Sequence, residues 1–93
     1  MTVTFCIPRA LRPLTDGSGQ VVVEASGNTL QDALEALFAI HPGIRDRILT
    51  EKREIREHVN VFIGKENARL ATGLATRLSD GTEVSILPAI SGG

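Results

Sequence analysis

Cysteine is almost absent from the sequence, and this shortage excludes several kinds of site. Cys6 is the single cysteine, so the chain can form no internal disulfide framework and no CxxC metal or redox motif. His41 and His58, the two histidines, complete no metal-ligand set with one cysteine, and we expect no metal site. A lone cysteine also agrees with a reducing compartment, so we expect a cytoplasmic protein.

Long apolar runs and an excess of charge are absent as well. No apolar stretch approaches the roughly 20 residues that a membrane helix needs, and the first residues lack the features of a signal peptide. Ten Lys and Arg stand against eleven Asp and Glu, for a formal net charge of −1, so no charge excess attracts nucleic acid or an anionic membrane. We expect neither as a partner. A length of 93 residues predicts a single domain over residues 1–93.

Alternation of apolar and other residues predicts strands along the chain. It occurs over residues 2–7, 20–26, 58–64 and 82–89, and a period of two is typical of half-buried strands. The turn sequence at 15–19 favours a hairpin between the first two strands. A weaker strand-like segment lies around residues 68–70.

From Thr29 onward the apolar period becomes that of a helix. Leu30, Ala33, Leu34, Leu37 and Phe38 form one apolar stripe. Asn28 or Thr29 can cap this helix, and Asp32 suits its first turn. The sequence HPG at 41–43 ends it, a short helical turn is expected at 44–49, and the charged residues 50–57 are predicted to form a solvated connection.

This order of elements predicts an α+β protein with a β-grasp (ubiquitin-like) fold, in which a mixed sheet of four to five strands packs on one main helix. The first strand would be central and the last strand would lie beside it. That arrangement directs the C-terminus away from the core, so we expect residues 89–93 to form a flexible tail that ends in Gly92 and Gly93.

Several motifs resemble those of the MoaD/ThiS family of ubiquitin-like sulfur carriers. They are GNTLQDALEAL at 27–37, HPGIRDRIL at 41–49, HVNVFI at 58–63 and LSDGTEVSILPAISGG at 78–93. The ending is the most specific of these, because a D-G turn, a V-x-I-x-P strand and a terminal Gly-Gly follow one another closely. The stretch IPRALRP at 7–13 is more similar to carriers that serve cysteine biosynthesis than to small subunits of molybdopterin synthase.

The resemblance implies a protein cosubstrate and not an enzyme. An E1-like enzyme would adenylate the carboxylate of Gly93 with ATP, and a sulfur donor would convert it to a thiocarboxylate. The chain itself would bind no cofactor. A second enzyme would accept the sulfur, and a pyridoxal-phosphate-dependent enzyme that makes cysteine is the favoured acceptor. We expect the free chain to be a monomer.

The chemistry of the last residues supports this role for them. A carboxylate is a poor electrophile, so adenylation must supply a leaving group before a sulfur nucleophile can attack. Glycine lacks a Cβ and accepts φ of either sign, so Gly92 and Gly93 permit close approach of the backbone within a narrow channel. Pro88 would end the last strand, and Ser91 would thread the channel together with Gly92.

Strand parity predicts an apolar docking patch on the sheet face opposite the helix. Phe62 and Leu87 point outward there, with Cys6 and Pro8 beside them, and an exposed apolar cluster of this kind marks a partner-binding site. The alternative is that Phe62 packs under a loop. Three cations could make salt-dependent contacts at the rim of the patch: Arg12, Lys65 and Arg69.

Alternative functions remain open on the residues alone. The same fold could serve as a non-covalent interaction module, or as a modifier that uses Gly93 to acylate lysines. Within the carriers, the acceptor could instead be a molybdopterin precursor or the thiazole of thiamine. We expect Cys6 to be an inert apolar residue, because the sequence predicts no base or cation beside it.

Overall fold

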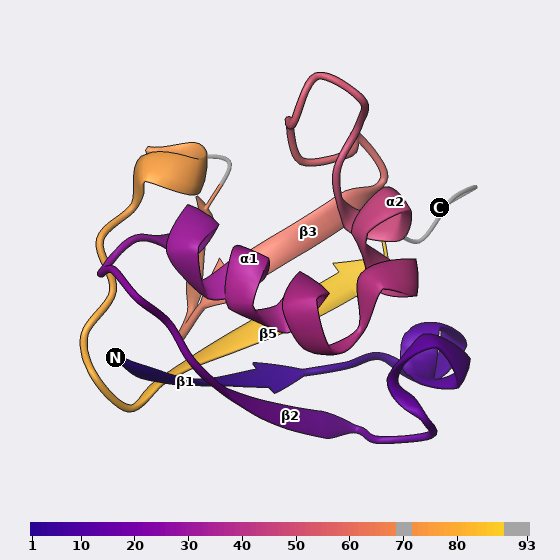
Figure 1. Ribbon diagram of the computed structural model, residues 1–93. Helices are drawn as coiled ribbons and strands as arrows, with labels where there is room; N and C mark the ends of the chain where they lie inside the picture. The colour runs from indigo at the N-terminus through magenta and orange to yellow at the C-terminus, as the bar shows by residue number, and fades with distance from the viewer. Residues whose placement is uncertain (69–71, 89–93) are drawn as a thin grey trace.

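The computed structural model describes residues 1–68 and 72–88, and in them a five-stranded sheet packs against one main helix (Figure 1). The strands lie in the order β2-β1-β5-β3-β4. Their bounds are Thr2–Cys6 for β1, Gln20–Glu24 for β2, Val59–Ile63 for β3, Glu66–Asn67 for β4 and Thr82–Pro88 for β5. The predicted α+β class and β-grasp fold are confirmed.

The sheet is mixed because the central strand, β5, runs parallel to its neighbour β1. Phe5 of β1 lies opposite Val21 in the antiparallel β1–β2 pair and opposite Val84 in the β1–β5 pair. All three side chains are buried, as the two-residue period of strands requires for one face of a sheet. The expected hairpin of the first two strands and the position of the last strand beside the first are both confirmed.

Helix α1 (Leu30–Ile40) lies across the buried face of the sheet (Figure 1). The five residues of its predicted stripe are all buried. Its N-terminus carries a capping box, in which Thr29 Oγ1 accepts from the Asp32 amide at 3.2 Å and Asp32 Oδ2 accepts from the Thr29 amide at 3.2 Å. Of the two predicted caps, Thr29 is therefore the one used.

Short helical segments connect the main elements. They are the 3-10 helices η1 (Arg9–Thr15), η2 (Pro42–Ile44) and η4 (Gly73–Ala75), and the four-residue helix α2 (Arg45–Ile48). The charged residues 51–54 are exposed, and a bridge between Leu49 and Ile55 holds the base of their loop. This segment is the predicted solvated connection.

The predicted strand around residues 68–70 is misplaced. β4 covers Glu66–Asn67 and pairs with Phe62 and Ile63, because Gly64, with φ of +61°, makes a tight turn directly after β3. Ala68 is buried beyond this strand, and residues 69 and 70 lie outside the described residues.

β5 ends at Pro88, which lies opposite Val59 at the start of β3. The described part of the chain therefore ends on the central strand of the sheet. It ends at the same end of the sheet as the one at which β3 begins. Ser91, Gly92 and Gly93 lie outside the described residues, so the flexible tail stays a prediction. Among the residues that the structure describes, no helix is long and apolar enough to cross a membrane.

Candidate functional site

The end of β5 presents an apolar side chain on the outer face of the sheet, the face opposite α1. Leu87 is 45% exposed and pairs with Asn60 of β3. Ile86 before it is fully buried on the inner face. The alternation along β5 therefore directs Leu87 outward, as predicted, next to the point where the chain leaves the sheet.

A shallow hollow of ≈ 610 Å³ lies beside Leu87. β1, β2, β5 and the start of η1 build it, and its lining residues are Cys6, Ile7, Pro8, Arg12, Gly19, Gln20, Ser85, Ile86 and Leu87. The structure thus brings Pro8 and Leu87 together, as the predicted patch requires. We call this hollow, as defined by its lining residues, the β5-end hollow.

Phe62 lies one strand further from the β5-end hollow. It is half-buried and pairs with Ser85 of β5 on one side and with Asn67 of β4 on the other. Val61 before it is buried on the inner face, so the alternation along β3 directs Phe62 to the outer face, as predicted. It does not line the hollow, so the predicted patch consists of two neighbouring parts.

Arg12 is one of the residues that line the hollow. Its Nε donates to the carbonyl oxygen of Ile7 at 3.1 Å. A Cβ placed on Gly19 would lie 3.1 Å from the guanidinium. The arginine can therefore pack closely against this position because glycine has no side chain. The sequence signal for this close approach was the glycine at the end of the DGSG turn, directly before β2.

Cys6 is half-buried in the same hollow, opposite Gln20 of β2 and Ser85 of β5. The sequence predicted no cation beside it, and the structure places Arg12 among the residues that line the same hollow. The cause is η1, which turns the chain back over the end of β1 and could not be read from the strand pattern. The side chains of Gln20 and Ser85 were not predicted to take part.

The remaining candidates do not converge on one place. Lys65 is exposed in the turn between β3 and β4, at the end of β3 away from Leu87. Arg69 lies outside the described residues. His58 is exposed directly before β3, and His41 is the C-cap residue of α1. Within residues 1–68 and 72–88, no group of three or more His, Cys, Asp or Glu side chains could hold a metal ion.

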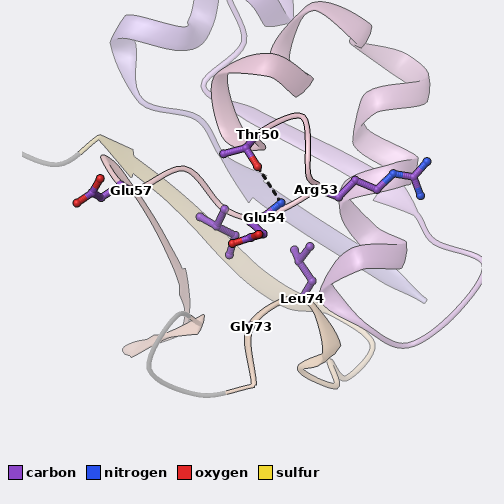
Figure 2. A pocket seen from close by; sticks show the side chains of 7 residues that line it. Thr50, Arg53, Glu54, Glu57, Gly73 and Leu74 are labelled. Atoms are coloured by element: carbon purple, nitrogen blue, oxygen red, sulfur yellow. Dashed lines mark hydrogen bonds between the residues drawn. The ribbon is translucent and has the colours of Figure 1, made fainter.

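A second hollow of ≈ 580 Å³ lies on the helix side, between residues 50–57 and η4 (Figure 2). Thr50, Arg53, Glu54, Ile55, Glu57, Gly73 and Leu74 line it. Thr50 Oγ1 accepts from the Glu54 amide at 3.2 Å and so holds the loop. The charged ends of Arg53, Glu54 and Glu57 point in different directions (Figure 2).

These surfaces can bind a partner, but the described residues bring no catalytic groups together. The β5-end hollow combines an exposed leucine, a proline and a fixed arginine within reach of the last residues of β5. A mixture of apolar and arginine side chains is typical of protein interfaces. The arrangement therefore offers apolar surface beside an oriented cation, which is a combination found in protein contacts.

Comparison with known proteins identifies relatives of the whole chain. The model of the ThiS family matches residues 7–93. The sulfur carrier protein CysO of Mycobacterium tuberculosis is 41% identical over 95 residues, which cover 100% of both chains. Small archaeal modifier protein 1 of Haloferax volcanii is 36% identical over 78 residues, covering 83% of this chain and 85% of that protein.

Solved structures agree with these relatives in fold. CysO in the crystal structure of the Amycolatopsis orientalis BexX/CysO complex superposes with a TM-score of 0.85 at 35% identity, covering 98% of this chain and 99% of that one. The resemblance stated from the sequence motifs is thereby confirmed.

Proposed function

Because the chain belongs to the ThiS family, we propose that it is a sulfur carrier protein that donates sulfur from a thiocarboxylate at Gly93. The observation that carries this proposal is the 41% identity to a sulfur carrier protein over the full length of both chains. The relatives that are sulfur carriers are protein cosubstrates and not enzymes, which supports the same role here.

The chemistry begins at the carboxylate of Gly93. An E1-like enzyme forms an acyl adenylate from this carboxylate and ATP, and pyrophosphate leaves. Hydrosulfide, released by the sulfur donor, then attacks the acyl carbon, the bond from the acyl carbon to the AMP oxygen breaks with AMP as the leaving group, and loss of the proton leaves the thiocarboxylate. The carrier binds no cofactor in this scheme, because the activating enzyme holds ATP and a second enzyme accepts the sulfur.

The β5-end hollow and Phe62 are proposed to dock the activating enzyme. Leu87 and Pro8 offer apolar surface beside the residue from which the tail departs, so a partner bound there is placed to receive the tail. Arg12 adds a cation that is already oriented by its bond to the Ile7 carbonyl. A preorganised side chain loses less entropy on binding.

The sulfur acceptor is proposed to be a second enzyme, with a pyridoxal-phosphate-dependent enzyme that forms cysteine as the favoured one. Similarity to CysO supports this route over those of molybdopterin and thiamine. The complex of BexX with CysO supports the idea that carriers of this kind form stable complexes with partner proteins.

Protein modification is a second candidate function. The similarity to small archaeal modifier protein 1 favours it, because that relative covers most of this chain. Both functions would begin with the same adenylate at Gly93 and would differ in the nucleophile that attacks it, either a sulfur donor or a lysine amine.

Intact-mass spectrometry tests the proposal. The purified chain is incubated with a cognate E1-like enzyme, ATP and a sulfur donor, beside a matched variant that lacks Gly93. We expect the full chain to exchange one oxygen for sulfur and the variant to keep its mass. The same exchange in both chains would refute the assignment to Gly93. Adducts on lysines in place of the exchange would favour the modifier.

A further inference from the structure

The outer edge of β2 is an open strand edge. β2 is the first strand in the sheet order, and no other described strand lies on its outer side. The opposite edge belongs to β4, which covers only Glu66–Asn67. The β2 edge, Gln20–Glu24, is thus the longer of the two edges that the described strands present.

Alternate backbone groups of β2 point to this open side. Flanking bonds fix the parity, since the Ile7 amide donates to the Gly19 carbonyl oxygen and the Ala25 amide donates to the Met1 carbonyl oxygen, both at 2.8 Å. In an antiparallel pair every second residue exchanges both bonds with its partner strand. The amides and carbonyls of Gln20, Val22 and Glu24 therefore face away from β1.

The middle of β2 carries little of the usual protection of an edge strand. Proteins block such edges with charged side chains, proline or a bulge, and in the sequence QVVVE the one charge is Glu24 at the end of the strand, with no proline or lysine. The β1–β2 register runs through β2 without a bulge. Val22, at the centre of the strand, is 61% exposed and lies on the outer face of the sheet. This edge can accept another strand.

An acidic groove runs along the same edge on the helix side. It has a volume of ≈ 530 Å³, and its lining residues are Glu24, Ser26, Asp32, Glu35, Ala36, Ala39 and Ile40. Two carboxylates, those of Asp32 and Glu35, come from α1, and no lysine or arginine lines the groove. Thr29 holds the Asp32 carboxylate in place through its hydroxyl at 2.8 Å. Ile40 is 53% exposed.

We propose that the β2 edge and this groove dock an extended segment of a partner protein in which Lys or Arg alternates with β-branched residues. The segment adds to β2 as a further strand and bonds to the free backbone groups of Gln20, Val22 and Glu24. Strand addition supplies affinity, and the acidic groove selects a basic partner. This site is separate from the proposed chemistry at Gly93.

The alternation of the segment follows from the two faces of the edge. Partner residues opposite Val21 and Val23 point to the helix side, where Lys or Arg meets Asp32 and Glu35. Their aliphatic stems cover Ala36, Ala39 and Ile40. Partner residues opposite Val22 point to the outer face, where a β-branched side chain packs against this exposed valine.

A second copy of the chain fits the edge less well. Its own β2, QVVVE, has no cation to offer to Asp32 and Glu35. Self-pairing through β2 is therefore an outcome that the experiment must separate from the proposal.

A titration of the ¹⁵N-labelled full chain followed by NMR tests the proposal. The probe is the acetylated, amidated peptide Gly-Lys-Val-Lys-Val-Lys-Val-Gly, and the control peptide carries Glu in place of each Lys. We expect the basic peptide to shift the amides of Gln20, Val22, Glu24 and Ala39, and to slow hydrogen exchange at Val22. The acidic peptide should bind at least about 5-fold more weakly.

Two pairs of variants locate the contact. Val22→Pro removes an outward N–H that an edge strand can spare, and Val22→Thr keeps it. Glu35→Lys reverses a charge in the groove, and Glu51→Lys makes the same change in the exposed 51–54 segment. We expect Val22→Pro to abolish binding and Glu35→Lys to weaken it about 5-fold, while both control variants bind normally.

The outcomes separate the alternatives even if Val22→Pro does not fold, because Glu35→Lys changes only an exposed side chain. Equal binding of both peptides, no binding, or shifts confined to other elements would overturn the proposal. Shifts of the β2 amides that depend on protein concentration without peptide would overturn it in favour of a second copy. The activating enzyme takes no part, so the result is independent of the sulfur-carrier proposal.

Discussion

At the scale of single residues, the start of α1 shows how closely neighbouring side chains are fitted. Thr29 and Asp32 satisfy each other's backbone amides, and Gly27 passes directly beside them. A Cβ at Gly27 would lie 2.0 Å from Asp32 Oδ2. Asn28 and Thr29 were equally good caps by sequence, because residue type alone does not say which of two neighbours has extended backbone geometry.

Thr29→Ala removes the hydroxyl that caps α1. We expect a loss of about 1 kcal/mol in the free energy of unfolding, because the Asp32 amide loses its acceptor at the N-terminus of the helix. Urea denaturation followed by circular dichroism measures this loss. The exposed Ser26 provides the control, and Ser26→Ala should change stability by less than about 0.5 kcal/mol. Equal losses in both variants would contradict the capping role.

At the scale of elements, side-chain parity was readable from the sequence and the neighbours of each element were not. Alternation correctly placed Val84 and Ile86 inward and Leu87 outward. The same alternation cannot say which strand lies alongside, because the period of two is independent of the partner. The β5-end hollow depends on such neighbours, since η1 carries Arg12 into the hollow that Cys6 also lines.

Leu87→Asp tests the docking role of the β5-end hollow. We expect binding to the activating enzyme to weaken about tenfold or more, since a charge replaces an apolar contact at the proposed interface. The free energy of unfolding should change by no more than about 1 kcal/mol, because Leu87 is 45% exposed and the remaining cost comes from Asp in a strand. Calorimetric titration and a denaturation curve measure the two quantities.

Ile40→Asp is the matched control for this variant. Ile40 is similarly exposed but lies on α1, away from the β5-end hollow, so the enzyme should bind this variant as it binds the unchanged chain. Weakened binding by both variants would point to a general effect of charge. A large loss of stability in Leu87→Asp would mean that this leucine belongs to the core.

At the scale of the whole molecule, the first and last strands depend on each other. β5 lies between β1 and β3, and the Gly81 amide donates to the Thr2 carbonyl oxygen at 2.7 Å. The sheet order therefore joins the two ends of the described chain. Periodicity alone could not predict this topology, and it entered the sequence analysis through the order of the elements and the family resemblance.

Two truncations separate the fold from the tail. Removing residues 82–93 should unfold the chain, because it leaves β1 and β3 without their shared neighbour and removes the buried Val84 and Ile86. Removing residues 89–93 should leave the thermal midpoint nearly unchanged, since β5 ends at Pro88. Thermal unfolding followed by circular dichroism compares the two. A folded product of the longer truncation would contradict the central role of β5.

The central claim is that the last residues do chemical work that the fold does not need, and Gly92→Val tests it most directly. The rate of adenylate formation is measured by pyrophosphate exchange with the cognate E1-like enzyme, beside a denaturation curve of the same sample. A β-branched side chain restricts χ1 and disfavours positive φ, so we predict a strong fall in the rate and an unchanged unfolding curve. An unchanged rate would show that the diglycine is a passive end, and a shifted unfolding curve would show that the tail is part of the folded domain.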